Sequence, residues 1–294
     1  MQVSTNTGMH GARPGKERYS PMETVSFLAD AGFRVLDFNF CAAIYTDPFT
    51  IDRTIVEPGW QHTIEALRNE MEKRQVVAKY SHLPFYRFDE PETADLDFKL
   101  EMTLRAIEAS GMLGVQWAVV HPSRSKDPDT AEANTVAYLE ILLEKATKHG
   151  VGLAVENMLS PDETYNNASA LCALVDRFGE GVGVCWDTGH ANLSKIDHAA
   201  NIKQLGRRIK MLHVHDNGGI KDEHRPPFLG NIDWQEVMAA LASAGFEGDL
   251  NFEVSAAPVP ESLRRSYAHY VYHTGVYLCG LFAECTRPPR EGHA

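Results

Sequence analysis

The 294-residue sequence lacks any apolar stretch long enough to cross a bilayer, since nowhere do eighteen apolar residues run together. Its first residues, MQVSTNTGMHG, also lack the basic region followed by an apolar one that a secretory signal requires. The 5 cysteines are scattered, odd in number and never spaced as CxxC. This pattern disfavours a disulfide framework or a zinc ribbon and favours unpaired thiols in a reducing compartment. We therefore expect a cytoplasmic protein.

Basic charge is also scarce. Lys and Arg number 28 against 40 Asp and Glu, which gives a net charge of -12. No cluster of Lys and Arg offsets this balance, and a surface of this sign repels phosphodiester backbones. Nucleic acid is therefore not expected as a partner. The charged fraction of 23% and the hydrophobic fraction of 44% are those of an ordinary globular protein.

Short apolar runs alternate with segments of helical periodicity along the whole chain. The predicted strands are 2–6, 34–40, 75–81, 115–121, 151–156, 182–187, 209–215 and 249–254. The predicted helices are 21–31, 59–74, 94–110, 129–149, 167–178, 197–205, 233–243 and 261–283. Apolar strands separated by helices indicate a parallel sheet covered by helices. We predict an α/β protein with a single (β/α)8 TIM barrel over residues 1–284 and a C-terminal tail over 285–294, with an open doubly wound sheet as the alternative.

Ionisable side chains gather at the C-terminal ends of the predicted strands and in the loops that follow, where barrels place their chemistry. They are His82, His121, Glu156, Asp187, His190, His213, His215, Asp222, His224 and Glu253. A single histidine at a strand end is more often structural than a ligand. Six of the 13 histidines share this end of the barrel, and this convergence predicts a functional site.

Glu156 and Glu253 end or interrupt apolar runs, and a buried carboxylate is costly unless it is paired or binds a metal. A salt bridge to a barrel Arg or Lys is the simpler explanation. The alternative is a mixed oxygen and nitrogen shell in which Glu156, Asp187, Glu253 and one imidazole, of His213 or His215, bind one Mn²⁺, Mg²⁺, Co²⁺ or Zn²⁺ ion. Such a shell leaves positions open for a substrate, which is typical of a catalytic metal site.

Several short motifs resemble those of a known family. They are VVHPS at 119–123, VENM at 155–158, WDTGHAN at 186–192, LHVHDN at 212–217, DEH at 222–224, GNIDW at 230–234 and FEV at 252–254. In this order they resemble the sugar phosphate isomerase/epimerase family of xylose isomerase-like TIM barrels, which are related to the endonuclease IV-type AP endonucleases. The resemblance spans about residues 75–254. It implies one divalent cation on Glu156, Asp187, His213 and Glu253, although His213 and His215 could exchange roles.

The endonuclease members bind three zinc ions, and the resemblance matches their additional ligands to His82, His121, His190, Asp222 and His224. The simpler interpretation is that these residues, together with His215 and Arg225, bind a substrate. Family members often carry a G-x-G run before the IDW segment, whereas here Phe228 replaces the first glycine. The loss of this glycine weakens a phosphate cradle. It leaves Lys221, Arg124 and Arg225 as anion contacts and favours an unphosphorylated sugar.

The resemblance implies a metal-dependent isomerase or epimerase of sugars. Glu156 and Glu253 would move a proton through a metal-stabilised enediolate. The alternatives are an endonuclease IV-like multi-zinc phosphodiesterase, an inosose dehydratase or C-glycoside-cleaving lyase, and a noncatalytic barrel. The expected partner is a small sugar, with no membrane, and self-association is left open. Six aromatic residues in the long loops 41–60 and 82–92 could stack on a sugar or form a satellite core: Tyr45, Phe49, Trp60, Phe85, Tyr86 and Phe88.

Overall fold

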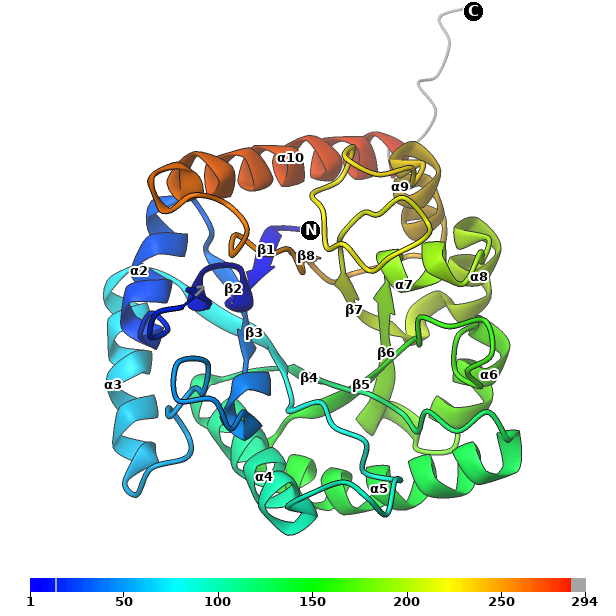
Figure 1. The fold of residues 1–294 in the computed structure, drawn as a ribbon. Coiled ribbons are helices and arrows are strands. Elements are labelled where there is room, and N and C mark those ends of the chain that lie inside the picture. Colours follow the sequence, from blue (N-terminus) through cyan, green and yellow to red (C-terminus); the bar gives the residue numbers. More distant parts are fainter. Residues whose placement is uncertain (14, 287–294) are drawn as a thin grey trace, which may run out of the picture.

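The computed structural model describes residues 1–13 and 15–286 and shows eight parallel strands surrounded by helices (Figure 1). The strands are β1 Val3–Asn6, β2 Val35–Asn39, β3 Val77–His82, β4 Trp117–Val120, β5 Gly152–Glu156, β6 Val182–Asp187, β7 Ile209–His213 and β8 Leu250–Phe252. Their order in the sheet is β7-β6-β5-β4-β3-β2-β1-β8. Within residues 1–13 and 15–286, a bridge between Val214 and Phe252 joins the two edge strands. The (β/α)8 prediction is therefore confirmed, with a barrel that is nearly closed.

Eight longer helices form the outer ring (Figure 1). They are α2 Pro21–Asp30, α3 Trp60–Lys73, α4 Leu96–Leu113, α5 Pro128–His149, α6 Ala168–Val175, α8 His198–Leu205, α9 Trp234–Ser243 and α10 Arg264–Cys285. Shorter helices lie in the loops: α1 Gly8–Gly11, α7 Thr188–Leu193, and the 3-10 turns η1 Cys41–Ile44, η2 Gly179–Gly181, η3 Gly206–Arg208 and η4 Glu261–Leu263. None of the helices in the described ranges is long and apolar enough to traverse a bilayer. Of the predicted tail, Cys285 ends α10, Thr286 follows it, and 287–294 lie outside the described residues.

Local signals explain where the helices begin and end. Ser20 and Glu23 form a capping box at the start of α2, with Pro21 in the first turn. Gly114 and Gly150 follow α4 and α5 in the left-handed conformation, at φ values of 82° and 70°, which glycine adopts at little cost. These residues fix the helix boundaries close to those predicted from the sequence.

The barrel interior is built in layers along the strands. Six buried side chains form an apolar layer inside the barrel: Val35, Tyr80, Val119, Ala154, Cys185 and Met211. Two residues further along each of these strands, on the same face, comes a polar side chain. These are Asp37, His82, His121, Glu156, Asp187 and His213. The apolar layer is thus the floor of a polar layer at the C-terminal ends of the strands.

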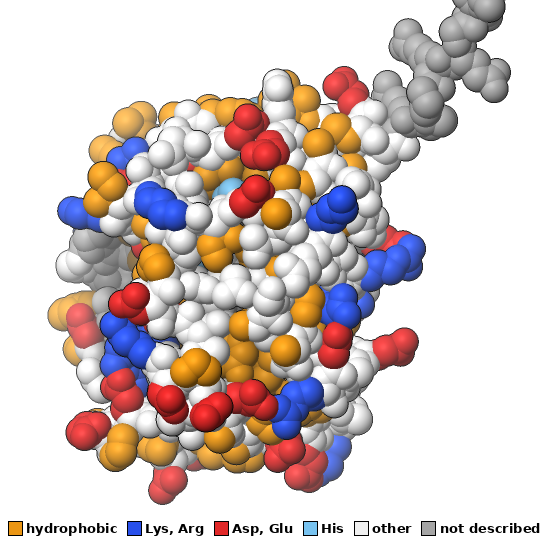
Figure 2. All heavy atoms as spheres, turned by 90° about the vertical axis from the view of Figure 1, so that its right-hand side faces the viewer, with side chains coloured by type: hydrophobic (Ala, Val, Ile, Leu, Met, Phe, Trp, Pro, Cys, Tyr) orange, Lys and Arg blue, Asp and Glu red, His pale blue; other side chains and the backbone are white. Residues whose placement is uncertain are grey.

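Charge is mixed on the face of the barrel that Figure 2 shows. On the side of the barrel where α6 and α8 lie, Lys and Arg are interspersed with Asp and Glu, and no basic stripe is seen on that face (Figure 2). This distribution offers no track for a phosphodiester backbone there.

Arg264, at the start of α10, joins two loops and is only 5% exposed. Its guanidinium donates to the carbonyl oxygens of Val259, Ala257 and Ala12, at 3.1, 3.2 and 3.0 Å. Arg264→Met is expected to lower the free energy of unfolding by about 2–4 kcal/mol, because it leaves these acceptors without a donor. Arg265→Met, at the adjacent exposed position, is the matched control in urea unfolding, and equal effects of the two changes would contradict this role.

Candidate functional site

The polar layer is centred on His213, which is fully buried. Its Nδ1 lies 2.8 Å from Glu156 Oε1, 3.2 Å from Glu253 Oε2 and 3.9 Å from Asp187 Oδ2. The four residues predicted to bind one cation are therefore brought together, although they come from four different strands or strand ends. No lysine or arginine forms an ion pair with these carboxylates in the described part of the chain.

Asp37 of β2 is a member of the layer that the sequence analysis missed. Its Oδ2 lies 3.4 Å from His213 Nε2, on the side of the ring opposite to Glu156. It also accepts hydrogen bonds from Asn6 and Asn251, both at 2.9 Å. A carboxylate within the apolar run RVLDFNF was the available signal.

His82 and His121 share the other oxygen of Glu156. His121 Nε2 lies 3.0 Å and His82 Nε2 lies 3.7 Å from Glu156 Oε2. His82 Nε2 is also 3.9 Å from Glu253 Oε1, and its Nδ1 is 3.0 Å from Cys41 Sγ. These two histidines thus form a second group of donors beside the central one.

A third group surrounds Asp222. His224 Nε2 lies 3.1 Å and His190 Nε2 lies 3.6 Å from its Oδ2, and His215 Nε2 lies 3.8 Å from its Oδ1. His215 Nε2 is closer to Asp187, at 3.0 Å from Oδ2. His224 adopts a left-handed φ of 45°, and such strain is typical of functional loops.

Asn157 positions this group and was also missed. Its side chain accepts from the Asp187 N–H at 2.6 Å and donates to the Asp187 carbonyl at 3.0 Å. Its own carbonyl lies 2.9 Å from His190 Nδ1. The only signal in the sequence was its place directly after Glu156.

Arg225 does not join the cluster. Its guanidinium pairs with Glu223 at 2.5 Å and donates to the Leu229 carbonyl at 3.0 Å. The loop is held instead by the buried Asp216, whose carboxylate accepts from the N–H groups of Asn217, Phe228 and Ile232 and from the Trp234 indole. Phe228, which replaces the first family glycine, has a left-handed φ of 72°.

Residues Thr188–Leu193, directly after β6, form the short helix α7. Asp187 caps this helix by accepting from the His190 N–H at 2.6 Å, and this cap directs His190 toward the site. A Cβ at Gly189 would lie 1.9 Å from the His215 ring. Glycine is needed here for close approach of that imidazole.

Gly189→Ala is expected to displace His215 and to destabilise the fold by about 1–3 kcal/mol through overpacking. Gly280→Ala is the matched control, because Gly280 lies in α10 with nothing near an added Cβ. That change is expected to stabilise the protein by up to about 1 kcal/mol. Urea unfolding of both variants measures the difference, and a neutral Gly189→Ala would show that the ring has room to move.

The carboxylates and imidazoles strongly shift one another's pKa values. Burial would lower the pKa of His213, but Cys185, Glu156 and Glu253 raise it well above its usual value. Because burial raises the pKa of the Cys185 thiol to about 12, that thiol is neutral near pH 7 and the carboxylates carry the effect. Burial also lowers the pKa of His190, but Asp187 and Asp222 outweigh this effect and raise it to about 10. For His224, burial lowers the pKa and a hydrogen bond to Asp222 raises it, and the net result is a pKa of about 9.

Both catalytic candidates are held ionised. Burial favours their neutral forms, yet His213 and His121 lower the pKa of Glu156, and His213 and His224 lower that of Glu253. Four buried polar atoms at the site make no well-aligned hydrogen bond among the described residues: Glu156 Oε2, Asp37 Oδ1, His213 Nε2 and His215 Nδ1. Glu156 Oε2 and His213 Nε2 do face a neighbouring group, His121 at 3.0 Å and Asp37 at 3.4 Å. Buried polar atoms are rarely left unpaired. Ionised oxygens beside imidazoles, with coordination capacity left over, fit a divalent cation.

The six loop aromatics divide between the two interpretations. Trp60 is buried, and Phe88 and Tyr86 pack on Tyr138 with ring centroids at 4.0 and 6.2 Å. Tyr45 and Phe49 are exposed, and the exposed Phe85 lies 4.2 Å from the His121 ring. Of these six, Phe85 combines exposure with a ring contact to a histidine of the site.

Comparison with known proteins agrees with this architecture. A family model described as the xylose isomerase-like TIM barrel matches residues 25–270. An L-ribulose 3-epimerase of Mesorhizobium japonicum is 28% identical over 141 residues, a match that covers 46% of this chain and 45% of that protein. An uncharacterized protein of Sinorhizobium fredii is 28% identical over 162 residues, which is 52% of each. The chain thus spans about half the length of these curated relatives.

Solved structures show the same fold at lower identity. A D-tagatose 3-epimerase-like protein has a TM-score of 0.74 at 19% identity, with 98% of this chain and 100% of that chain covered. An L-ribulose 3-epimerase has a TM-score of 0.73 at 17% identity, with 99% and 100% covered. The match of the family model over residues 25–270 shows that the chain belongs to the xylose isomerase-like TIM barrel family.

Proposed function

We propose that this protein is a sugar isomerase or epimerase that holds one divalent cation on Glu156, Asp187, His213 and Glu253. The observation that carries the proposal is that His213 Nδ1 lies within 3.9 Å of all three carboxylates. His213 is favoured over His215 because His215 pairs only with Asp187 among these ligands. The relatives named as epimerases support the substrate class.

The carboxylates are suited to moving a proton next to a carbonyl group. A divalent cation held there supplies Lewis acidity, which makes the C–H beside a chelated carbonyl more acidic. Glu253 has 18% of its side chain exposed, against 1% for Glu156, so it is the base that a substrate reaches more readily. Glu253 is ionised, as removal of a proton requires. For isomerisation, Glu253 gives the proton that it has removed to the adjacent carbon. For epimerisation, Glu156 must first be protonated, and His82, whose Nε2 lies 3.7 Å from Glu156 and 3.9 Å from Glu253, is placed to pass the proton from Glu253 to Glu156, which returns it on the other face.

The substrate is an unphosphorylated sugar or sugar derivative. Three basic side chains were considered as contacts for a phosphate. Of these, Arg225 forms an ion pair with Glu223. Arg124 is engaged at 2.5 Å by Glu163, whose side chain is 4% exposed. Only Lys221 is left without such a partner in the described chain. The histidines of the second and third groups are placed to hydrogen-bond hydroxyl groups instead.

A multi-zinc phosphodiesterase is the second candidate, and the grouping of the donors favours it. His82 and His121 share Glu156, while His190, His215 and His224 surround Asp222. Such a division could hold two further cations beside the central one. The acidic balance of the chain argues against a DNA substrate.

Metal analysis of the purified protein separates the candidates, because one ion per chain is expected for the isomerase and three for the phosphodiesterase. Deuterium uptake from D2O into a panel of free ketoses, followed by NMR, then tests proton transfer. Incorporation at a single carbon next to the carbonyl is expected. Cleavage of abasic DNA by a three-zinc protein, with no incorporation into any sugar, would overturn the proposal.

A further inference from the structure

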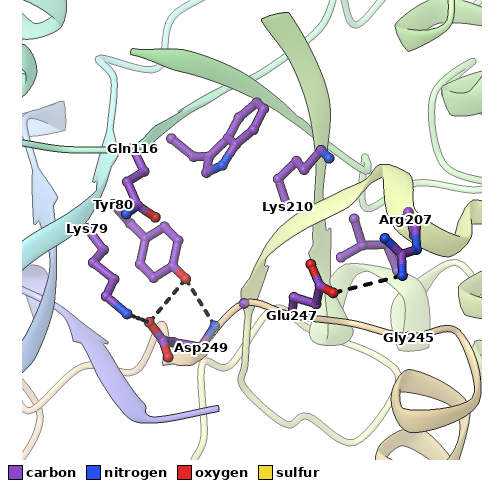
Figure 3. Close-up of a pocket in the computed structure, with 11 residues that line it drawn as sticks. Lys79, Tyr80, Gln116, Arg207, Lys210, Gly245, Glu247 and Asp249 are labelled. Carbon is purple, nitrogen blue, oxygen red and sulfur yellow. Dashed lines mark hydrogen bonds and ion pairs between the residues drawn. The ribbon is translucent and has the colours of Figure 1, made fainter. Parts of the chain in front are cut away.

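A cavity lies at the N-terminal end of the barrel, opposite to the polar layer and below the apolar layer (Figure 3). Its volume is about 310 Å³. The starts of β3, β4 and β7 and the loop before β8 line it, and its lining includes Lys79, Trp117, Arg207, Lys210, Glu247 and Asp249. The chemistry proposed above uses none of these residues.

Two strand glycines make room for the side chains that line this cavity. Gly152 and Gly183 stand two residues before Ala154 and Cys185, at the position below the apolar layer. A Cβ at Gly152 would lie 2.4 Å from the Trp117 ring, and a Cβ at Gly183 would lie 2.2 Å from Lys210 Cγ. Glycine within a strand marks such close approach. The two glycines therefore leave the space in which the side chains of Trp117 and Lys210 lie.

Both lysines occupy irregular positions in their strands. Leu36 and Asp37 pair with Ala78 and Tyr80, so that Lys79 is passed over. In the same way Val184 and Cys185 pair with Ile209 and Met211, so that Lys210 is passed over. An extra residue of this kind re-aims its side chain, and here both ammonium groups reach the cavity (Figure 3).

The charges of the lining do not balance. Lys79 Nζ lies 2.8 Å from Asp249 Oδ2, which also accepts from the Tyr80 hydroxyl at 3.3 Å. At the exposed rim, Arg207 lies 3.9 Å from Glu247. Lys210 Nζ lies 5.5 Å from the centroid of the Trp117 ring and pairs with no carboxylate of residues 1–13 or 15–286. One positive charge is left over in a chain whose net charge is -12.

We propose that this cavity binds a small molecule that carries one oxyanion group, a carboxylate or a phosphate. The anionic group lies against Lys210, and the body of the molecule covers the Trp117 indole. A single negative charge completes the balance of the lining, and the half-buried position of Lys210 limits screening by solvent. The proposal does not depend on the reaction at the other end of the barrel.

The indole N–H resonances of 15N-labelled protein test this directly, since the chain has only 4 tryptophans. Trp117→Phe assigns the Trp117 resonance. Sodium phosphate and, separately, sodium benzoate are titrated at constant ionic strength against chloride. We expect a saturable shift of the Trp117 resonance with at least one of them, while the buried Trp60, Trp186 and Trp234 do not respond. A response to phosphate alone, or to benzoate alone, identifies the class of natural ligand.

Lys210→Met is expected to weaken the response at least tenfold, and Lys203→Met, on the exposed face of α8, is expected to leave it unchanged. Lys210→Gln replaces the first variant if Met disturbs the dispersion of the spectrum. The proposal is overturned if neither anion gives a saturable shift of Trp117. It is also overturned if the Lys210 variant titrates like the unaltered protein.

Discussion

Glu253→Gln is expected to reduce kcat for proton transfer by roughly 10²–10⁴, the range that a positioned general acid or base contributes. Glutamine keeps the size and an oxygen ligand but cannot accept the proton. Glu253 is the most exposed of the four carboxylates that contact His213, so its loss removes the base that the substrate meets. Deuterium incorporation per unit time measures the effect on the same sugar that the unaltered protein turns over.

Two measurements separate this role from a structural one. Glu144→Gln, at an exposed position on α5, is expected to leave kcat unchanged. Metal analysis of Glu253→Gln is expected to show that the ion is retained, because Glu156, Asp187 and His213 stay in place. Full activity of Glu253→Gln with its metal bound would show that Glu253 is not the base.

Removal of the metal is expected to have the second large effect. A chelator should abolish turnover and lower Tm by about 10 °C, since a ligand at 1,000 times its Kd stabilises a protein by about 4 kcal/mol. Re-addition of one equivalent of metal should restore both. A chelated protein with unchanged Tm and full turnover would contradict the metal site.

The affinity for metal should also depend on pH. Near neutral pH the raised pKa of His213 keeps a proton on this ring in the metal-free protein, and a ligating imidazole must give that proton up. Affinity is therefore expected to rise about tenfold per pH unit for each proton displaced. Displacement of one proton, a tenfold rise in affinity per pH unit, is expected for a single cation. A steeper dependence of affinity on pH would indicate that His190 and His224, with pKa values of about 10 and 9, also lose protons when metal binds.

The same pKa values predict how stability changes without metal. A histidine whose pKa is raised in the folded state stabilises the fold fully below its unfolded value near 6.5. This contribution is lost as pH rises toward 9–10, the folded values of His224 and His190. The difference in Tm between the metal-bound and metal-free proteins should therefore widen from pH 6.5 to pH 9. If this difference in Tm stayed constant with pH, the protonated histidines would not be stabilising the metal-free protein by compensating the charge of the carboxylates.

Particular elements show where sequence patterns sufficed. Helices such as α5 and α9 were placed within a residue or two, because a capping aspartate precedes each and a glycine follows α5. The strand predicted over 209–215 ends at His213 instead, because Val214 then bridges to Phe252 and Asp216 to Arg225. Helix α7 was missed because TGHANL has no apolar periodicity and depends on the Asp187 cap.

By itself the sequence determined the alternation of strands and helices and the two-residue period that sets a polar side chain beyond each apolar one. These features are local, because the side-chain periods of helices and strands follow directly from backbone geometry. Only the tertiary structure decided which atoms meet: that His213 lies between Asp37 and Glu156, that Arg225 turns to Glu223, and that Lys79 and Lys210 reach one cavity. The physical reason is that these contacts depend on barrel closure and on register shifts between strands, which join residues too far apart in the chain for any local pattern to relate.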